Sequence, residues 1–254
     1  MTEEKLEYEI QFAGFDNLMP HRVHKILLVA SPYDSSIIAD DNRLTELIFN
    51  EYINLNLRYT PQIRRVSTTR EALRKLRHEE FDIIITMVRT GDTDLMRFAK
   101  KAKAITPKTA VVVLAYNRID IQGLPIDRGH NIDYVFLWNG DARILLSIIK
   151  LIEDRKNVNY DIKAGVKTII LIENSVRFYS TYLPILYTEI MKHTQFLLEE
   201  GVNTAHKFLR MRARPKILLA TNYEEGKELY SKYKANTLGV ISDMQFPRKA
   251  KADP

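Results

Sequence analysis

Short apolar runs alternate along the chain with longer stretches in which apolar residues recur at helical spacing. The run 25–30 (KILLVA) is apolar at nearly every position, which is typical of a strand buried on both faces of a parallel sheet. The following stretch, 37–55, carries Leu44, Leu47 and Ile48 along one helical stripe. Further strands are expected over 62–67, 81–87, 109–115 and 134–138, and further helices over 68–78, 94–104 and 142–157. This alternation predicts an α/β fold with a doubly wound parallel sheet.

A polar segment over 159–165 precedes a second, shorter copy of the alternation. Strands are expected there over 166–172, 216–221 and 238–242, and helices over 178–200 and 224–234. The copy matches the first half of the upstream unit, which indicates a divergent internal repeat. We therefore expect a lead-in (1–24), a complete domain (25–158), a linker (159–165) and a second domain (166–254) that reaches only its third strand.

The strand order expected for the complete unit is 2-1-3-4-5, the flavodoxin-like arrangement. No Gly-x-Gly-x-x-Gly follows the first strand, which argues against a dinucleotide-binding sheet. The third strand is interior in the 2-1-3-4-5 order. A unit that reaches only its third strand leaves 238–242 as an unpaired apolar edge, so we expect self-association through this edge or by exchange of elements between chains.

Composition narrows the class of protein. The chain has 254 residues, of which 45% are hydrophobic and 28% charged, as in ordinary globular domains. No apolar run is long enough for a membrane helix, and the first residues lack the features of a secretion signal. The absence of cysteine excludes disulfides and thiolate metal sites. We expect a cytoplasmic protein that does not engage a membrane.

The net charge of +6 raises the question of nucleic-acid binding. The basic residues are dispersed, however, and nucleic acid is not the expected partner. The densest cluster, Arg210, Arg212 and Arg214, lies just before the strand 216–221. It is a candidate site for an acidic partner or a phosphate group.

The most informative single residue is Asp243, which directly follows the predicted strand 238–242. The carboxyl ends of parallel strands are where open α/β sheets bind ligands. A carboxylate there can accept a phosphoryl group or bind a hard metal ion. Glu173 follows the predicted strand 166–172 in the same way.

The runs 169–175 (IILIENS) and 241–247 (ISDMQFP) resemble phosphoacceptor receiver domains of two-component signalling. The resemblance implies that Asp243 accepts a phosphoryl group from a histidine kinase or a small phosphodonor. It also implies a Mg²⁺ site made by Glu173, Asp243 and the backbone carbonyl of Gln245. Asn174 stands where the family has a second acidic residue, which removes one charge from that site. The hydroxyl residue on strand four and the lysine on strand five of the family would lie beyond residue 254.

The first unit resembles the same family without its chemistry. Met87 falls at the acceptor position, Ala115 replaces the hydroxyl residue, and Leu137-Trp138 stand where Lys-Pro is usual. Methionine cannot accept phosphate, so we interpret this unit as a pseudo-receiver. Asp82 precedes the apolar core of its strand, at the end opposite the functional edge, and a structural role is expected for it.

A second resemblance covers nearly the whole chain. The runs 24–36 (HKILLVASPYDSS), 141–158 (DARILLSIIKLIEDRKNV) and 208–219 (FLRMRARPKILL) resemble bacterial proteins that are phosphoenolpyruvate synthase-like and carry a pyruvate phosphate dikinase ATP-binding domain. This implies a regulatory region whose catalytic domain lies downstream in the same polypeptide, and the present chain is not expected to be an enzyme itself.

Two functions remain open from the sequence. The first is a signal receiver in which Asp243 is phosphorylated. The second is a phosphorylation-independent scaffold that docks a partner or a downstream catalytic domain, which Asn174 and Met87 favour. A nucleotide-binding enzyme is disfavoured because no glycine-rich phosphate loop is present.

Overall fold

The computed structural model describes residues 18–31, 60–88, 93–122, 131–138, 140–199 and 213–244. The helix predicted from the stretch 37–55 lies in a part of the chain that is not described. The chain divides into two compact units. One, Val23–Ile149, is called the five-stranded unit below; the other, Lys150–Pro254 together with Met1–Arg22, is called the three-stranded unit.

The five-stranded unit contains a fully parallel sheet in the order β2-β1-β3-β4-β5. Its strands are β1 (Lys25–Val29), β2 (Gln62–Val66), β3 (Ile83–Met87), β4 (Ala110–Ala115) and β5 (Tyr134–Leu137). This is the flavodoxin-like order, and it confirms the fold class predicted from the sequence. The apolar runs of β1, β3 and β4 are buried almost throughout because each lies between two other strands and between layers of side chains.

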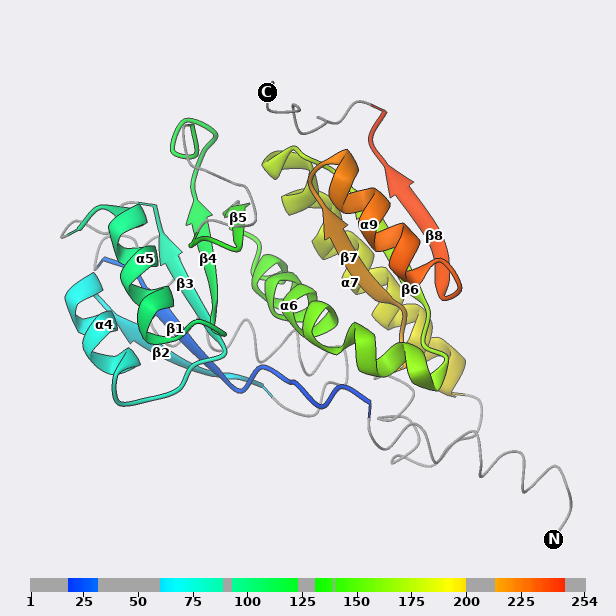
Figure 1. The fold of residues 1–254 in the computed structure, drawn as a ribbon, viewed down its shortest axis with the longest axis horizontal. Helices are drawn as coiled ribbons and strands as arrows, with labels where there is room; N and C mark the ends of the chain where they lie inside the picture. Colours follow the sequence, from blue (N-terminus) through cyan, green and yellow to red (C-terminus); the bar gives the residue numbers. More distant parts are fainter. Residues whose placement is uncertain are drawn as a thin grey trace, which may run out of the picture. The chain divides into compact units, whose positions relative to one another are not determined.

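Helices α4 (Thr69–Leu76) and α5 (Leu95–Ile105) lie together on one face of this sheet (Figure 1). Each begins at a side chain that accepts a backbone N–H. Thr68 Oγ1 accepts from the Glu71 N–H at 3.2 Å, as expected of the capping sequence. Asp94 Oδ1 accepts from the Arg97 N–H at 3.0 Å. Local sequence thus sets where both helices start.

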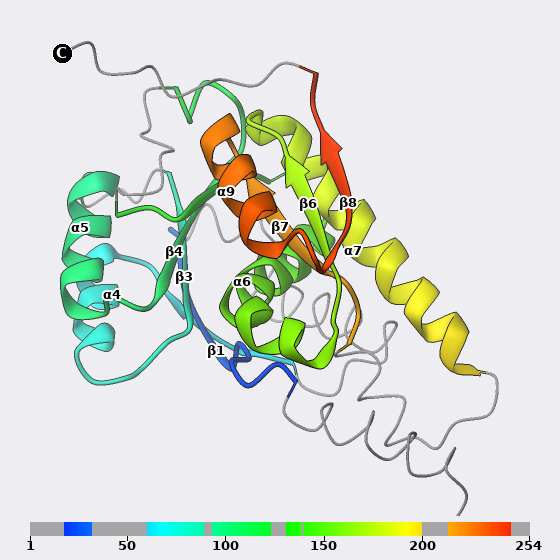
Figure 2. The same ribbon diagram turned by 45° about the vertical axis from the view of Figure 1, so that its right-hand side comes forward.

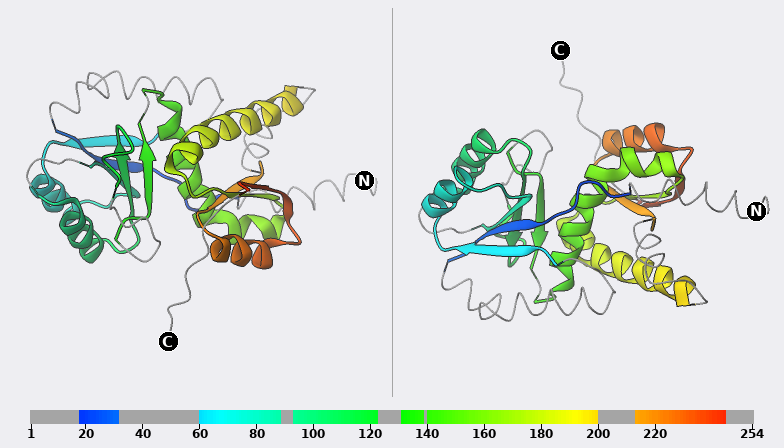
Figure 3. Two further views of the ribbon diagram at one scale, coloured as in Figure 1. Left: turned by 90° about the horizontal axis from the view of Figure 1, so that it is seen from above. Right: turned by 90° about the horizontal axis from the view of Figure 1, so that it is seen from below.

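The three-stranded unit contains a parallel sheet in the order β7-β6-β8, built from β6 (Thr168–Ile172), β7 (Lys216–Ala220) and β8 (Thr237–Ser242). This order matches β2-β1-β3 of the larger sheet, as the internal repeat predicts. Helix α7 (Val176–Glu199) covers one face, while α9 (Tyr223–Tyr233) and the end of α6 cover the other (Figure 3). Their shared core on the α9 side contains Val158, Ile170, Leu218, Leu229 and Tyr233.

Helix α6 (Arg143–Asp161) contributes to both units. The segment 159–165, predicted as a linker, instead continues α6 to Asp161, then forms a 3-10 turn over Ile162–Ala164 and ends at Gly165 with φ 80°. The boundary between the units therefore lies inside a helix, at Ile149/Lys150, rather than in a polar linker. None of the helices in the described part of the chain has the length and hydropathy needed to cross a membrane.

Strand β8 lies at the outer edge of the smaller sheet, beside β6 (Figure 2). Its residues from Leu238 to Ser242 are all exposed, although the sequence is as apolar as that of an interior strand. Val240 and Ile241 are consecutive and both exposed, so apolar side chains emerge on both faces of the strand. Within the described residues, β8 pairs with β6 alone.

Candidate functional site

Glu173 and Asp243 lie at the carboxyl edge of the three-stranded sheet, each directly after a strand. The strands β6 and β8 are neighbours, and Ile172 is paired with Ser242. The Asp243 N–H donates to the Ile172 carbonyl at 3.0 Å, and the Glu173 N–H donates to the Ala220 carbonyl at 2.9 Å. The backbone ladder therefore fixes both residues at the same level of the same edge.

The environment of the Glu173 side chain disfavours its negative charge. The residue is only 3% exposed, and its Oε1 accepts the Ser175 N–H at 2.8 Å. Burial, followed by the charge of Asp243, raises the pKa of Glu173 above 4.5, while the backbone N–H groups of Ser175 and Asn174 partly oppose this shift. A cation bound between the two carboxylates would relieve both the burial penalty and the repulsion.

Asp243 is half-buried and oriented by its own turn. Its Oδ1 accepts the Met244 N–H at 2.6 Å, and the Ser242 hydroxyl donates to the Asp243 carbonyl at 2.8 Å. One carboxylate oxygen is thus held by the backbone of its own turn.

The donor set at this edge is small. The side chain of Asn174 is exposed, and Gln245, whose carbonyl is the further predicted ligand, lies outside the described residues. No group of three or more His, Cys, Asp or Glu side chains able to hold a metal ion occurs in the part of the chain that the structure describes. Two carboxylates still meet the minimum for Mg²⁺, which keeps several waters and is bound in many phosphoryl-transfer sites by one or two carboxylates with the phosphate.

The corresponding edge of the five-stranded unit is apolar. Met87 at the end of β3, Ala30 after β1, Ala115 at the end of β4 and Trp138 after β5 are all buried. The carboxylates Asp34, Asp40 and Asp41, which follow β1 in sequence, lie outside the described residues. None of these four buried side chains can accept a phosphoryl group or serve as a Mg²⁺ ligand.

Asp82 occupies the opposite end of the five-stranded sheet. Its Oδ2 accepts the backbone N–H groups of His24 at 2.7 Å and Lys25 at 3.0 Å, where β1 begins. The carboxylate therefore joins the starts of two neighbouring strands, which is an internal structural contact.

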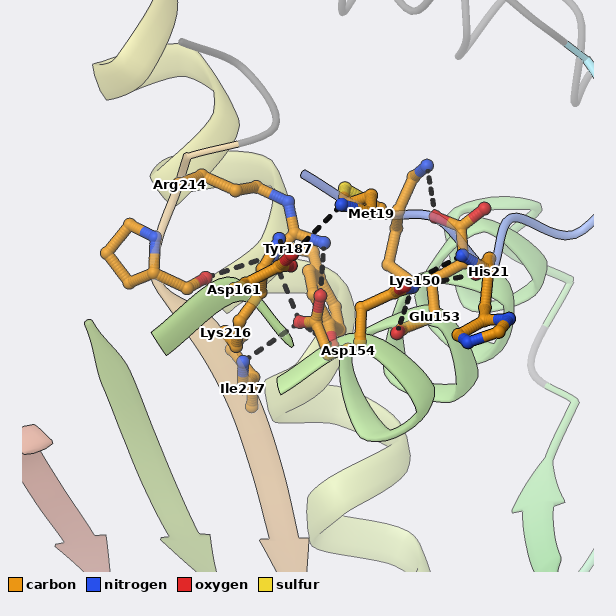
Figure 4. A network of polar contacts seen from close by, with 12 residues as sticks. Met19, His21, Lys150, Glu153, Asp154, Asp161, Tyr187, Arg214, Lys216 and Ile217 are labelled. Carbon is orange, nitrogen blue, oxygen red and sulfur yellow. Dashed lines mark hydrogen bonds and ion pairs between the residues drawn. The ribbon is translucent and has the colours of Figure 1, made fainter. Parts of the chain in front are cut away.

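A buried network of charged groups lies in the three-stranded unit, at the amino end of β7 (Figure 4). At its centre is Asp154 of α6, which is fully buried. Its Oδ2 accepts from Tyr187 Oη at 2.9 Å, from Arg214 Nη1 at 3.0 Å and from the Ile217 N–H at 2.9 Å, and its Oδ1 accepts from Arg214 Nη2 at 2.8 Å. This one carboxylate thus ties together α6, α7 and the beginning of β7.

Arg214 was a candidate for binding an acidic partner, and the structure gives it an internal role instead. The guanidinium is buried, forms its ion pair with Asp154 at 2.8 Å and also donates to the Pro215 carbonyl. Burial acts against its charge, but the charges of Asp154 and of neighbouring groups outweigh burial and raise the Arg214 pKa. Arg210 and Arg212, the other members of the predicted cluster, lie outside the described residues.

A second buried ion pair extends the network. Lys216 Nζ lies 3.0 Å from Asp161 Oδ2, and both side chains are fully buried. Burial, with the nearby charge of Arg214, lowers the Lys216 pKa, while Asp154 and Asp161 act in the opposite direction. Asp161 Oδ1 also accepts the Met19 N–H at 2.9 Å.

Asn157, one turn before Asp161, exchanges two hydrogen bonds with the backbone of His21, at 2.8 and 2.7 Å. These contacts explain why residues 18–22 belong to the three-stranded unit rather than to a separate lead-in. Sequence reasoning missed this network. The available signal was the spacing of Asp154, Asn157 and Asp161, which places three polar side chains on one face of a helix that is otherwise rich in apolar residues.

Solved structures that are similar to this chain include several receiver domains. A response regulator receiver protein from Sinorhizobium medicae WSM419 is 14% identical, with 52% of this chain and 95% of that chain covered and a TM-score of 0.38. A CheY-like response regulator receiver domain from Methanospirillum hungatei JF-1 is 15% identical, with 56% and 98% covered and a TM-score of 0.39. A response regulator from Burkholderia pseudomallei, solved with a phosphorylated aspartic acid, a calcium ion and citrate, is 12% identical, with 75% and 95% covered and a TM-score of 0.36.

No protein-family model matches the sequence, and no curated protein is similar to it. The assignment of the fold therefore rests on the strand order and the parallel register of the two sheets.

Proposed function

We propose that the chain is a signal-receiver module in which Asp243 of the three-stranded unit accepts a phosphoryl group. The observation that carries the proposal is the placement of Glu173 and Asp243 on adjacent strands, at the ligand-binding edge of the sheet, close enough for the Asp243 charge to raise the Glu173 pKa. A pair of carboxylates held in mutual repulsion by a rigid backbone is suited to a cation and to the phosphate that the cation binds.

The reaction follows from the orientation of Asp243. Because Oδ1 accepts the Met244 N–H, Oδ2 is the nucleophile. It forms a P–O bond in line with the breaking P–N bond of a phosphohistidine donor, and the released imidazole nitrogen takes up a proton. The product is an acyl phosphate on Asp243, and the same step applies to small phosphodonors such as phosphoramidate.

Glu173 and Asp243, with the Gln245 carbonyl, are the residues proposed to hold Mg²⁺. The ion, when bound, neutralises charge on the transferring phosphoryl oxygens. Glu173 must be ionised to bind it, and the raised pKa means that protons compete with the metal for this side chain over a wider pH range than at an ordinary glutamate.

The five-stranded unit is proposed to be a pseudo-receiver that takes part in docking. Its apolar carboxyl edge, with Met87 buried at the acceptor position, supports a role that requires no phosphorylation. The resemblance of the runs 24–36, 141–158 and 208–219 supports a further proposal, that the module regulates a phosphoenolpyruvate synthase-like domain downstream in the same polypeptide.

The test is phosphorylation of the purified chain with phosphoramidate and Mg²⁺, followed by intact-mass measurement and peptide mapping. We expect one hydroxylamine-sensitive phosphoryl group at Asp243, absent from Asp243→Asn and from samples treated with a metal chelator. Glu189→Gln, an exposed carboxylate change on α7, is the matched control and should be labelled normally. Equal labelling of wild type and Asp243→Asn, or no labelling of either, would reject the phosphoacceptor and leave the scaffold as the function.

A further inference from the structure

Helix α7 carries large apolar side chains on the side that faces solvent. Its core side is formed by residues such as Tyr179, Leu183, Tyr187 and Met191, all of which are buried. Four large apolar residues lie on the opposite side, with exposed fractions of 44% for Phe178, 41% for Tyr182, 50% for Ile185 and 66% for Phe196. A helix that needed only to cover its own sheet would have polar residues on this side.

These exposed residues follow the repeat of a coiled coil. Steps of four and three residues alternate along the solvent side of α7, through the positions Phe178, Tyr182, Ile185, Glu189, Lys192 and Phe196, which we call the α7 seam. This is the spacing by which two helices present a continuous contact stripe to each other. The seam occupies most of the 24-residue helix, and the last turns of α7 extend past the sheet (Figures 2 and 3).

We propose that the α7 seam binds the α7 seam of a second copy of this chain, with the two helices antiparallel. The seam is symmetric about Tyr187, so an antiparallel pair centred there matches every position with another seam position. Phe178 then packs on Phe196 of the second copy. Tyr182 meets Lys192, and Ile185 lies over the aliphatic part of Glu189, each from the opposite chain.

The charges on the seam select this arrangement. In a parallel pair in register, Glu189 would face Glu189 and Lys192 would face Lys192, and like charges at such positions destabilise a helix pair. In the antiparallel pair, the Lys192 ammonium lies over the Tyr182 ring, a favourable cation–π contact. Glu189 keeps its contact with Lys192 of its own chain, where Oε1 and Nζ are 3.6 Å apart.

The aromatic end of the seam is already ordered for contact. The Phe178 and Tyr182 rings are stacked, with centroids 6.0 Å apart and an angle of 8° between their planes. The Arg177 guanidinium lies 5.9 Å from the Phe178 centroid. Because these side chains are held in one arrangement before association, less side-chain entropy is lost when a second helix packs on them.

The exposed strand β8 offers a competing route to self-association, and substitutions separate the two. Ile185→Lys places a charge at the centre of the seam, whereas Val240→Lys is the matched change on β8; both residues are exposed, so neither change should disturb the core. By sedimentation equilibrium we expect Ile185→Lys to weaken dimerisation about tenfold or more, and Val240→Lys to leave it unchanged. The proposal would be overturned if the wild-type chain were monomeric at about 100 micromolar, roughly the dissociation constant of a weak specific dimer. It would also be overturned if only Val240→Lys lost the dimer.

The direction of pairing can be read by disulfide trapping, because the natural chain contains no cysteine. A mixture of Tyr182→Cys and Lys192→Cys chains should form a mixed disulfide. Each variant alone should not cross-link, since like positions lie about 15 Å apart along the antiparallel pair and a disulfide needs Cβ atoms about 4 Å apart. Homodisulfides in the single variants, or no mixed product in a sample that dimerises, would reject the antiparallel seam.

Discussion

Removing the Arg214 side chain tests whether the buried network holds the three-stranded unit together. In Arg214→Met, a residue of similar length fills the space, but Asp154 loses both guanidinium hydrogen bonds, at 3.0 and 2.8 Å, and its only direct ion pair among the described residues. Asp154 remains fully buried and keeps its contacts with Tyr187 Oη and the Ile217 N–H.

The expected cost follows from leaving one charge of the pair in the interior. Breaking a buried pair from one side typically destabilises a protein by about 3–5 kcal/mol. The two neutral donors that remain on Asp154 place the expected loss near the lower end, at about 3 kcal/mol in the free energy of unfolding of this unit. Lys216 moderates the loss further, because removing Arg214 relieves the repulsion that lowers its pKa.

The double variant Arg214→Met/Asp154→Asn separates loss of the pair from burial of an unpaired charge. Asparagine can still accept from Tyr187 and Ile217 without a buried charge, so we expect the double variant to be more stable than Arg214→Met alone. The assay is hydrogen exchange of the β7 amides (Lys216–Ala220), with the β4 amides (Ala110–Ala115) of the other unit as an internal reference. A loss below about 1 kcal/mol for Arg214→Met, or additive losses in the double variant, would refute this account of the network.

Three further changes test the remaining sites. Glu173→Gln should stabilise the three-stranded unit at neutral pH, because glutamine resembles the protonated form of the side chain. The folded state raises the pKa of Glu173. The stabilisation that its proton provides is therefore complete below pH 4.5 and is lost as pH rises through the raised pKa. The melting temperature of Glu173→Gln should be higher than that of wild type at pH 7 and equal to it at acid pH. Failure of both comparisons would contradict this prediction. Asn174→Asp adds a carboxylate to the same edge and should increase Mg²⁺ affinity about tenfold, measured by titration calorimetry with Asp243→Asn as the negative control. Asp82→Ala should destabilise the five-stranded unit by about 1 kcal/mol, because the backbone N–H groups of His24 and Lys25, where β1 begins, lose an acceptor. The fluorescence of Trp138 reports the unfolding of this unit, and an unchanged unfolding midpoint would show that water replaces the carboxylate without cost.

The sequence was informative about the candidate site because that site depends on topology alone. Once β6 and β8 are recognised as the first and third strands of a repeat, parallel pairing must bring Glu173 and Asp243 to one edge. The sequence placed Arg214 in a candidate binding cluster and gave no sign that its side chain is buried. A run of arginines appears basic in the sequence whether it faces solvent or a buried carboxylate, and Asp154, its partner, lies 60 residues earlier on another element.

The close packing of α9 on β6 gives a second example, at a single position, of a feature that the sequence does not explain. Gly226 lies inside α9, where glycine is locally unfavourable, and nothing nearby in the sequence explains its use. In the folded unit, a Cβ at this position would come within 2.8 Å of Ile172 Cδ1. Only the approach of the helix to the strand reveals why the position has no side chain.

The sequence by itself determined the order of strands and helices, the parallel sheets and the repeat, because these depend on the period of apolar residues and on short connections. It also placed Asp243 and Glu173 at strand ends. Tertiary structure alone decided that α6 carries the unit boundary, that Asp154 and Asp161 neutralise Arg214 and Lys216 in the interior, and that the α7 seam faces solvent. Those features depend on which surfaces meet across the fold, and the apolar or charged character of a residue does not specify the group that it meets.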